Sequence, residues 1–199
     1  MPHSSCNPLT EGALPVMHKV LRCELFKTSD ALAQAECDNI DPLQQQLQTV
    51  AALLRSHGRD EDLEFEALLR EYDPMLANIL EDDHLKLEAD LVRLLSAVQA
   101  LSNIAAANRQ APLQQLYMDW NLFVGHYLLH MDDEERRLLV VIKEHMPPLS
   151  RVRQSIDMFE PQPRQRFIKN LKQVTTLHEQ QHILGSHTQN HNSYQKEPA

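Results

Sequence analysis

The chain has little of what β-sheets, disulfide scaffolds and thiolate zinc sites require. Its 199 residues include 4 glycines and 3 cysteines, and aromatic residues make up 5%. Strands favour β-branched and aromatic side chains, so a composition rich in Leu, Ala, Gln and Glu favours helices instead. Three cysteines without CxxC spacing argue against a disulfide framework or a thiolate zinc site. We therefore expect an all-α protein of the reducing cytoplasm.

The sequence also has no long apolar run and no large basic cluster. No run approaches the roughly 20 apolar residues that cross a bilayer. The start, MPHSSCNPLTEGALP, lacks the basic and then apolar layout of a secretory signal. The formal net charge is −9, and the short basic stretches near the C-terminus are typical of a solvated helix face. We expect neither a membrane nor a nucleic acid as a partner.

Prolines and short polar stretches divide the chain into helical blocks. The expected helices cover residues 13–27, 42–72, 75–108, 112–145 and 161–184. The stretch TSDALAQAECDNIDP is either a connection or an extension of the first helix. Four long helices with modest connections predict an antiparallel up-down-up-down four-helix bundle with an additional C-terminal helix. The expected organisation is a lead over 1–12, the bundle over 13–146, a helical extension over 147–184 and a disordered tail over 185–199.

Each helix of such a bundle buries an apolar stripe whose members are three and four residues apart. In the fourth helix the stripe has one step out of phase near its end and contains Leu113, Leu116, Trp120, Phe123, Tyr127, His130, Glu134, Leu138 and Val141. Polar residues interrupt the stripe in all four long helices. The interrupting residues are His18, His57, Glu61, His84, His130 and Glu134. Because an unpaired buried carboxylate is strongly destabilising, these residues need a common partner.

A metal centre in the middle of the bundle would be such a partner. Two His-x-x-x-Glu pairs place their members one above the other on a helix face. Imidazoles bind Fe, Zn, Cu and Ni, and carboxylates neutralise charge and can bridge two ions. Four histidines and two glutamates exceed the needs of one tetrahedral zinc, but they suit two ions. The alternative is a buried polar network without metal. Tyr127, one turn from His130, is a core residue that could also hydrogen-bond a bound oxygen species.

At these residues the sequence resembles the hemerythrin-like (HHE cation-binding) family. The resemblance lies in the ordered set MHKVL, HGRDED, EDDHLKLEADL and HMDDEE, across residues 14–142 or about two-thirds of the chain. It implies a non-haem di-iron centre with an oxo or hydroxo bridge, open to O2, NO or peroxide, with zinc as the alternative metal. The implied terminal ligands are His18, His57, His84 and His130, and the implied bridging ligands are Glu61 and Glu134.

One position departs from the family pattern. Hemerythrins that carry O2 have a second histidine four residues further along the third helix, where this chain has Glu88. Fewer nitrogen ligands disfavour simple O2 carriage and favour sensing, iron handling or stress repair. His126 lies one position off the stripe and would add a nitrogen ligand only if its helix rotates. Glu88 is either an extra or substitute ligand or a surface acid. We expect a binding module, monomeric or homodimeric, rather than a turnover enzyme. The alternatives are a di-iron oxidase or peroxidase, an iron–sulfur repair protein and a structural di-zinc domain.

A second motif near the C-terminus matches a different chemistry. HEQQH at residues 178–182 has the HExxH pattern of zinc proteases, in which the histidines bind zinc and the glutamate is the general base. His187 falls one place early for the extended form of that motif, and no methionine follows Met158. We interpret this stretch as a solvated helix end. The same interpretation covers the other histidines of this region, with loose surface metal binding as the alternative: His178, His182, His187 and His191.

A ferritin-like carboxylate centre is a further alternative, because EDDH and HEQQH both contain Glu-x-x-His. It would use Glu81 and His84 together with Glu179 and His182. Glu81 lies off the stripe of the third helix, so this alternative is disfavoured.

Overall fold

The computed structural model describes residues 14–146, 161–177 and 179–180, and these residues form helices and no β-strand. The expected all-α class is confirmed for this part of the chain. None of the described helices has the length and apolarity that spanning a membrane requires. The helices are α1 (Leu14–Ala33), α2 (Asp41–Tyr72), α3 (Pro74–Ala100), α4 (Gln110–Asp133), α5 (Leu139–His145) and α6 (Pro161–Val174). Short 3-10 turns, η2 (Leu101–Asn103) and η3 (Ala106–Asn108), follow α3, and a π-helical turn, η4 (Glu134–Leu138), joins α4 to α5.

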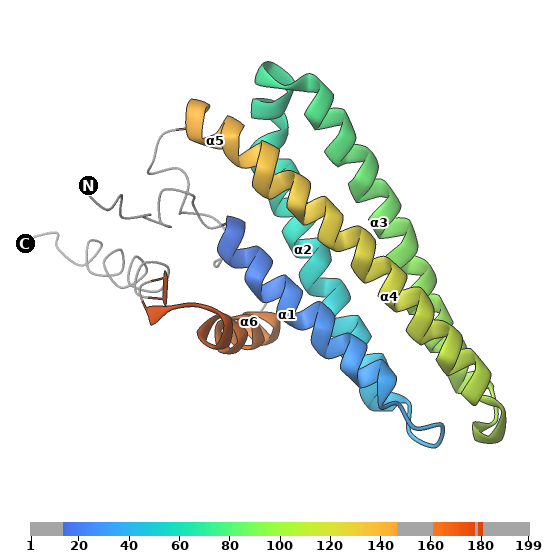
Figure 1. Cartoon of the computed structure of the whole chain (residues 1–199). Helices are drawn as coiled ribbons and strands as arrows, with labels where there is room; N and C mark the ends of the chain where they lie inside the picture. The colour runs from blue at the N-terminus through green and yellow to red at the C-terminus, as the bar shows by residue number, and fades with distance from the viewer. Residues whose placement is uncertain (1–13, 147–160, 178, 181–199) are drawn as a thin grey trace, which may run out of the picture.

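Four long helices lie side by side along most of their length (Figure 1). Helix α1 contacts α2 and α4, and α3 contacts the same two helices, so the contacts form a closed cycle. Helix α5 continues α4 beyond the π-helical turn, and α6 packs against α1 on its outer side (Figure 1). This arrangement brings one stripe of each long helix to a common interior.

Local sequence signals set the junction between α2 and α3. Pro42 and Pro74 lie in the first turns of these helices, where the missing N–H group has no intrahelical acceptor to lose. Asp73 alone separates the two helices. Its side chain accepts a hydrogen bond from the Leu76 N–H at 2.9 Å and caps α3. The tight junction keeps α2 and α3 adjacent from their first shared turn.

The first helix is extended and the third is shorter than expected. Helix α1 runs to Ala33, so the stretch TSDALA after residue 27 forms the extension that the sequence left open, because it includes good helix formers. Helix α3 ends at Ala100 instead of continuing to residue 108. There the Arg109 side chain donates to the carbonyl oxygens of Leu101 and Ile104 at 3.0 and 2.8 Å. These hydrogen bonds satisfy carbonyl groups that have no acceptor role left within the helix.

The last helix is shorter than expected. Helix α6 ends at Val174 rather than at residue 184. The sequence TTLHE explains this end, because Thr176 and Glu179 form a reciprocal capping box. The Thr176 N–H donates to Glu179 Oε2 at 2.8 Å, and the Glu179 N–H donates to Thr176 Oγ1 at 3.3 Å. A capping box starts a new helical turn and so interrupts the old one. The expected disordered tail, 185–199, lies outside the described residues.

The interior consists of two apolar cores with a polar layer between them. All members of the expected fourth stripe, from Leu113 to Val141, are buried. On α3, Leu80 belongs to one core and Leu87 to the other, and His84 lies between them in the chain. The same holds on α2, where His57 and Glu61 lie in the chain between Leu54 of one core and Phe65 of the other.

Candidate metal centre

The polar residues that interrupt the stripes meet in the layer between the two cores. They form two groups of four, and in each group the potential ligand atoms all lie within 4.8 Å of one another. The groups are His18, His57, Glu61 and Glu134, and Glu61, His84, His130 and Glu134. All of these side chains are buried except that of His84, which is 19% exposed. The structure thus brings every expected ligand to one place, and both glutamates belong to both groups. We call these residues the His/Glu cluster.

Glu61 turns one carboxylate oxygen towards the pair His18 and His57 and the other towards His84. Its Oε1 lies 3.2 Å from His57 Nε2 and 3.6 Å from His18 Nε2. Its Oε2 lies 3.7 Å from His84 Nε2. Helix α2 makes this possible because His57 and Glu61 are one turn apart on its buried face.

Glu134 is divided between the groups in the same way. Its Oε1 lies 3.0 Å from His130 Nε2 and 3.8 Å from His84 Nε2. Its Oε2 lies 3.3 Å from His18 Nε2, in the other group. All four histidines therefore present Nε2 to the centre of the cluster, and each glutamate connects the two histidine pairs.

Two metal ions fit this donor set. The cluster holds seven buried atoms without a hydrogen-bond partner: His18 Nε2, His57 Nε2, His130 Nδ1 and both carboxylate oxygens of Glu61 and of Glu134. Two ligands at right angles on one ion, each bound at about 2.1 Å, lie about 3 Å apart. His84 Nε2 and His130 Nε2 lie 3.1 Å apart. The spacing suits coordination, and ions would satisfy most of the unpaired atoms.

The metal-free cluster balances its charges internally. Burial lowers the pKa of His18, but its contacts with three glutamates outweigh burial and hold the pKa well above its ordinary value. The same competition raises the pKa of His84 to about 11, whereas burial lowers the pKa of His57 to about 4. Burial opposes ionisation of Glu61 and Glu134, yet the neighbouring histidines hold both pKa values below the usual range. His18 and His84 thus hold protons opposite Glu61 and Glu134, and a metal ion bound at their Nε2 atoms would have to displace these protons.

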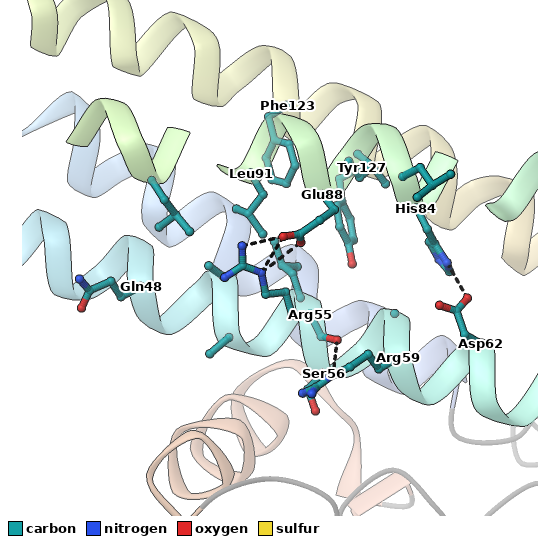
Figure 2. Close-up of a pocket in the computed structure, with 17 residues that line it drawn as sticks. Gln48, Arg55, Ser56, Arg59, Asp62, His84, Glu88, Leu91, Phe123 and Tyr127 are labelled. Carbon is teal, nitrogen blue, oxygen red and sulfur yellow. Dashed lines mark hydrogen bonds and ion pairs between the residues drawn. The ribbon is translucent and has the colours of Figure 1, made fainter. Parts of the chain in front are cut away.

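Two further carboxylates hold the outer nitrogens of two cluster histidines. His18 Nδ1 donates to Glu135 Oε1 at 2.9 Å, and Arg22 donates to the same oxygen at 2.7 Å. His84 Nδ1 donates to Asp62 Oδ1 at 2.9 Å (Figure 2). A carboxylate on Nδ1 fixes the tautomer that leaves Nε2 free to bind a metal ion. Sequence reasoning missed Asp62 and Glu135, although each directly follows a cluster glutamate.

A π-helical turn places the end of the fourth stripe. The stripe steps from His130 to Glu134 and from Glu134 to Leu138 are both four residues, which is the out-of-phase step in the sequence. The turn η4 spans Glu134–Leu138, and a π-helical turn accommodates one more residue than an α-helical turn. His130, Glu134 and Leu138 consequently all remain buried. Glu135 at the same time reaches His18 on α1.

Tyr127 lies beside the cluster but outside both groups of potential ligands. Its ring centroid is 5.9 Å from that of His130, and its side chain lines a pocket between the helices (Figure 2). Burial, together with the charges of Glu61 and Glu134, raises the pKa of Tyr127 well above its ordinary value. The phenol therefore stays protonated and can donate a hydrogen bond. Its role towards a bound ligand stays a prediction.

Neither position considered for an extra ligand contributes to the cluster. The His126 side chain is 52% exposed, with Nδ1 3.8 Å from Asp90 Oδ2, as its place off the stripe predicts. Glu88 forms a bidentate ion pair with Arg55, whose Nη2 and Nε lie 2.6 and 3.0 Å from Glu88 Oε1. Glu88 of α3 is therefore engaged with Arg55 of α2 and does not reach the cluster.

The residues of the ferritin-like and protease alternatives lie elsewhere. Glu81 is exposed and pairs with Arg70. Glu179 is buried, and Lys19 Nζ donates to its Oε1 at 2.6 Å. The interpretation of HEQQH as a wholly solvated helix end was therefore wrong for Glu179, because α6 docks this region against α1. The other candidates of this region lie outside the described residues: His178, His182, His187 and His191.

No family model, curated protein or solved structure matches this chain. The hemerythrin-like resemblance stays an expectation drawn from the ordered motifs. The geometry of the His/Glu cluster is therefore the basis for assigning a function.

Proposed function

We propose that this chain is a hemerythrin-like protein that holds two non-haem iron ions inside an antiparallel four-helix bundle. The closed cycle of contacts among α1, α2, α3 and α4 supports the bundle. The four ordered motifs and the convergence of their residues support the family. In this proposal His18 and His57 are the terminal ligands of one ion, and His84 and His130 are those of the other.

The observation that carries the proposal is the division of both glutamates between the two histidine pairs. Glu61 and Glu134 each direct one oxygen towards each pair, at 3.0 to 3.8 Å from the imidazole nitrogens. One structural zinc takes four ligands, so it would leave part of this donor set buried and unpaired. Two divalent ions carry four positive charges. These charges are opposed by the two cluster glutamates and, just outside, by Asp62 and Glu135.

Two iron ions would supply redox chemistry towards O2, NO or peroxide. The residues of the chain determine how such a ligand approaches. His84 is the least buried member of the cluster, and two pockets between α2 and α3 border it. Buried Leu54, Leu87 and Phe123 line the larger pocket and limit the access of water from that side. The protonated Tyr127 is proposed to donate a hydrogen bond to a small ligand there.

The proposed role is binding or sensing a small oxidant, or handling iron, rather than multiple turnover. Glu88, at the position of the additional histidine in O2 carriers, is paired with Arg55, and His126 is exposed. Each ion thus keeps two nitrogen ligands, which disfavours simple O2 carriage. An oxidase or peroxidase and a structural zinc pair remain the competing roles.

Anaerobic loading of the full-length protein with Fe(II), followed by exposure to air, tests the proposal. We expect two iron ions per chain and an optical change that reverses when the oxidant is removed. Repeated consumption of oxidant would assign an enzyme, and preferential retention of redox-inert zinc would assign a structural role. Binding of less than one ion per chain would contradict the proposal. His126→Ala is the matched control and should load as the parent does.

A further inference from the structure

A groove of about 760 Å³ runs between α2 and α3 beside the His/Glu cluster (Figure 2). Its volume lies within the range of about 300–1,000 Å³ that is typical of small-molecule sites. Buried apolar side chains from three helices form its floor: Leu54, Leu87, Leu91 and Phe123. The groove is therefore large enough and apolar enough for an organic ligand, not only a diatomic one.

The two ends of the groove differ in polarity, and the Arg55–Glu88 ion pair connects α2 and α3 between them (Figure 2). Along α2 its lining runs from Gln48 to Asp62, a rise of about 20 Å. Alanines and leucines line the half near Gln48: Ala51, Ala52, Leu91 and Leu95. Arg59, Asp62 and His84 line the half beside the cluster. Such a gradient suits a ligand with a polar head and a hydrocarbon chain.

Arg59 is the charged group available to that head. The Arg55 guanidinium is occupied by Glu88, and His84 is occupied by Asp62. Arg59 Nε donates to the Arg55 carbonyl oxygen at 3.2 Å, but the Arg59 guanidinium forms no ion pair with any residue that the structure describes. A guanidinium can bind a carboxylate through two parallel hydrogen bonds. The flanking Asp62 and Glu88 would repel a ligand that carries several negative charges.

Gly58 keeps the groove open beside Arg59. A Cβ added at Gly58 would meet no atom within 4 Å, so packing does not require a glycine there. Glycine inside a helix is nevertheless less stable than alanine. Gly58 lines the groove, and any larger side chain would project into its space. A groove that binds a ligand would explain why a glycine stands here despite its cost to the stability of the helix.

We propose that this groove binds an amphipathic monocarboxylic acid, with the carboxylate on Arg59 and the hydrocarbon chain on the apolar floor formed by Leu54, Leu87 and Phe123. Arg59 supplies the charge, the floor supplies apolar contact, and Tyr127 borders the ligand in the groove wall. The interaction uses no metal ion. It is therefore independent of the proposed iron centre, and the two proposals can fail separately.

Calorimetric titration of the metal-free, full-length protein with octanoate and with 1-octanol tests the carboxylate contact. We expect one octanoate per chain and about tenfold or more weaker binding of the alcohol. Arg59→Gln should weaken octanoate binding to the level of 1-octanol. Arg136→Gln is the charge-matched control, because Arg136 is exposed on the π-helical turn and pairs with Asp132. Equal affinity for the acid and the alcohol in the parent protein would overturn the proposal.

Filling the groove tests its location. Gly58→Leu should abolish octanoate binding, whereas Gly125→Leu should leave it unchanged. Gly125 is the matched control because it also lies inside a helix, with no atom within 4 Å of an added Cβ, but on α4 outside the groove. Thermal melting of both variants checks that they fold. Absence of saturable binding to the parent protein, or parental affinity in folded Gly58→Leu, would overturn the proposal.

Discussion

Replacing Glu134 with glutamine is expected to weaken the binding of both proposed metal ions at once. Its two oxygens face different histidine pairs, at 3.0 Å from His130 Nε2 and 3.3 Å from His18 Nε2. Glutamine keeps the shape of the side chain, but it loses the negative charge and replaces one oxygen with an amide nitrogen that does not bind metal. The variant therefore removes the shared carboxylate without creating a cavity.

The size of the effect follows from linkage. An ion present at 100 times its dissociation constant stabilises the folded state by about 2.7 kcal/mol. A chain of this length gains about 2–4 °C in Tm per kcal/mol, so each ion should add about 5–10 °C and both should add about 10–20 °C. In Glu134→Gln we expect the metal-induced shift to fall below about 5 °C, because neither ion keeps its full ligand set.

Thermal melting with and without metal, combined with metal analysis, is the assay. His57→Gln is the informative comparison, because His57 belongs to one group of potential ligands and its loss should spare the other ion. His126→Ala should retain the full shift. A Glu134→Gln protein with two ions and a parental shift, or one indistinguishable from His57→Gln, would refute the division of Glu134 between two ions.

Three further outcomes follow from the geometry. Metal uptake at pH 7 should release about two protons per chain, since His18 and His84 are protonated in the metal-free cluster and bind metal only when neutral. Calorimetry in buffers of different ionisation enthalpy counts these protons, and a value near zero contradicts the charge assignment. Glu135→Gln should weaken metal binding about 10–100-fold in a chelator competition, whereas exposed Glu144→Gln should not, because Glu135 orients His18. Gly58→Ala should raise Tm by about 2–4 °C through helix propensity, and a lower Tm would show that packing needs the glycine.

The three- and four-residue spacing of the apolar stripes located the cluster in the sequence, because burial of a helix face depends mainly on spacing along the chain. His84 could be assigned to the interior from the leucines on either side of it, without knowledge of any other helix. Asp62 and Glu135 could not be assigned in this way. They lie beside the stripe, and their contacts with His84 and His18 depend on the rotation and separation of neighbouring helices.

Interruptions and docking were harder to predict than the stripes. The π-helical turn appeared in the sequence only as two consecutive four-residue steps, from His130 to Glu134 and from Glu134 to Leu138. The capping box of Thr176 and Glu179 was readable in TTLHE, but the burial of Glu179 was not. That burial depends on Lys19 of α1, which is distant in sequence and near in space. The groove likewise depends on how α2 and α3 pack.

The most direct test of the two-ion site is the metal content of the full-length protein purified from its own host and measured per chain. The proposal predicts two iron ions per chain, and a loss of both in Glu134→Ala. A protein that holds one ion or none, or whose ions are unaffected by Glu134→Ala, would contradict it.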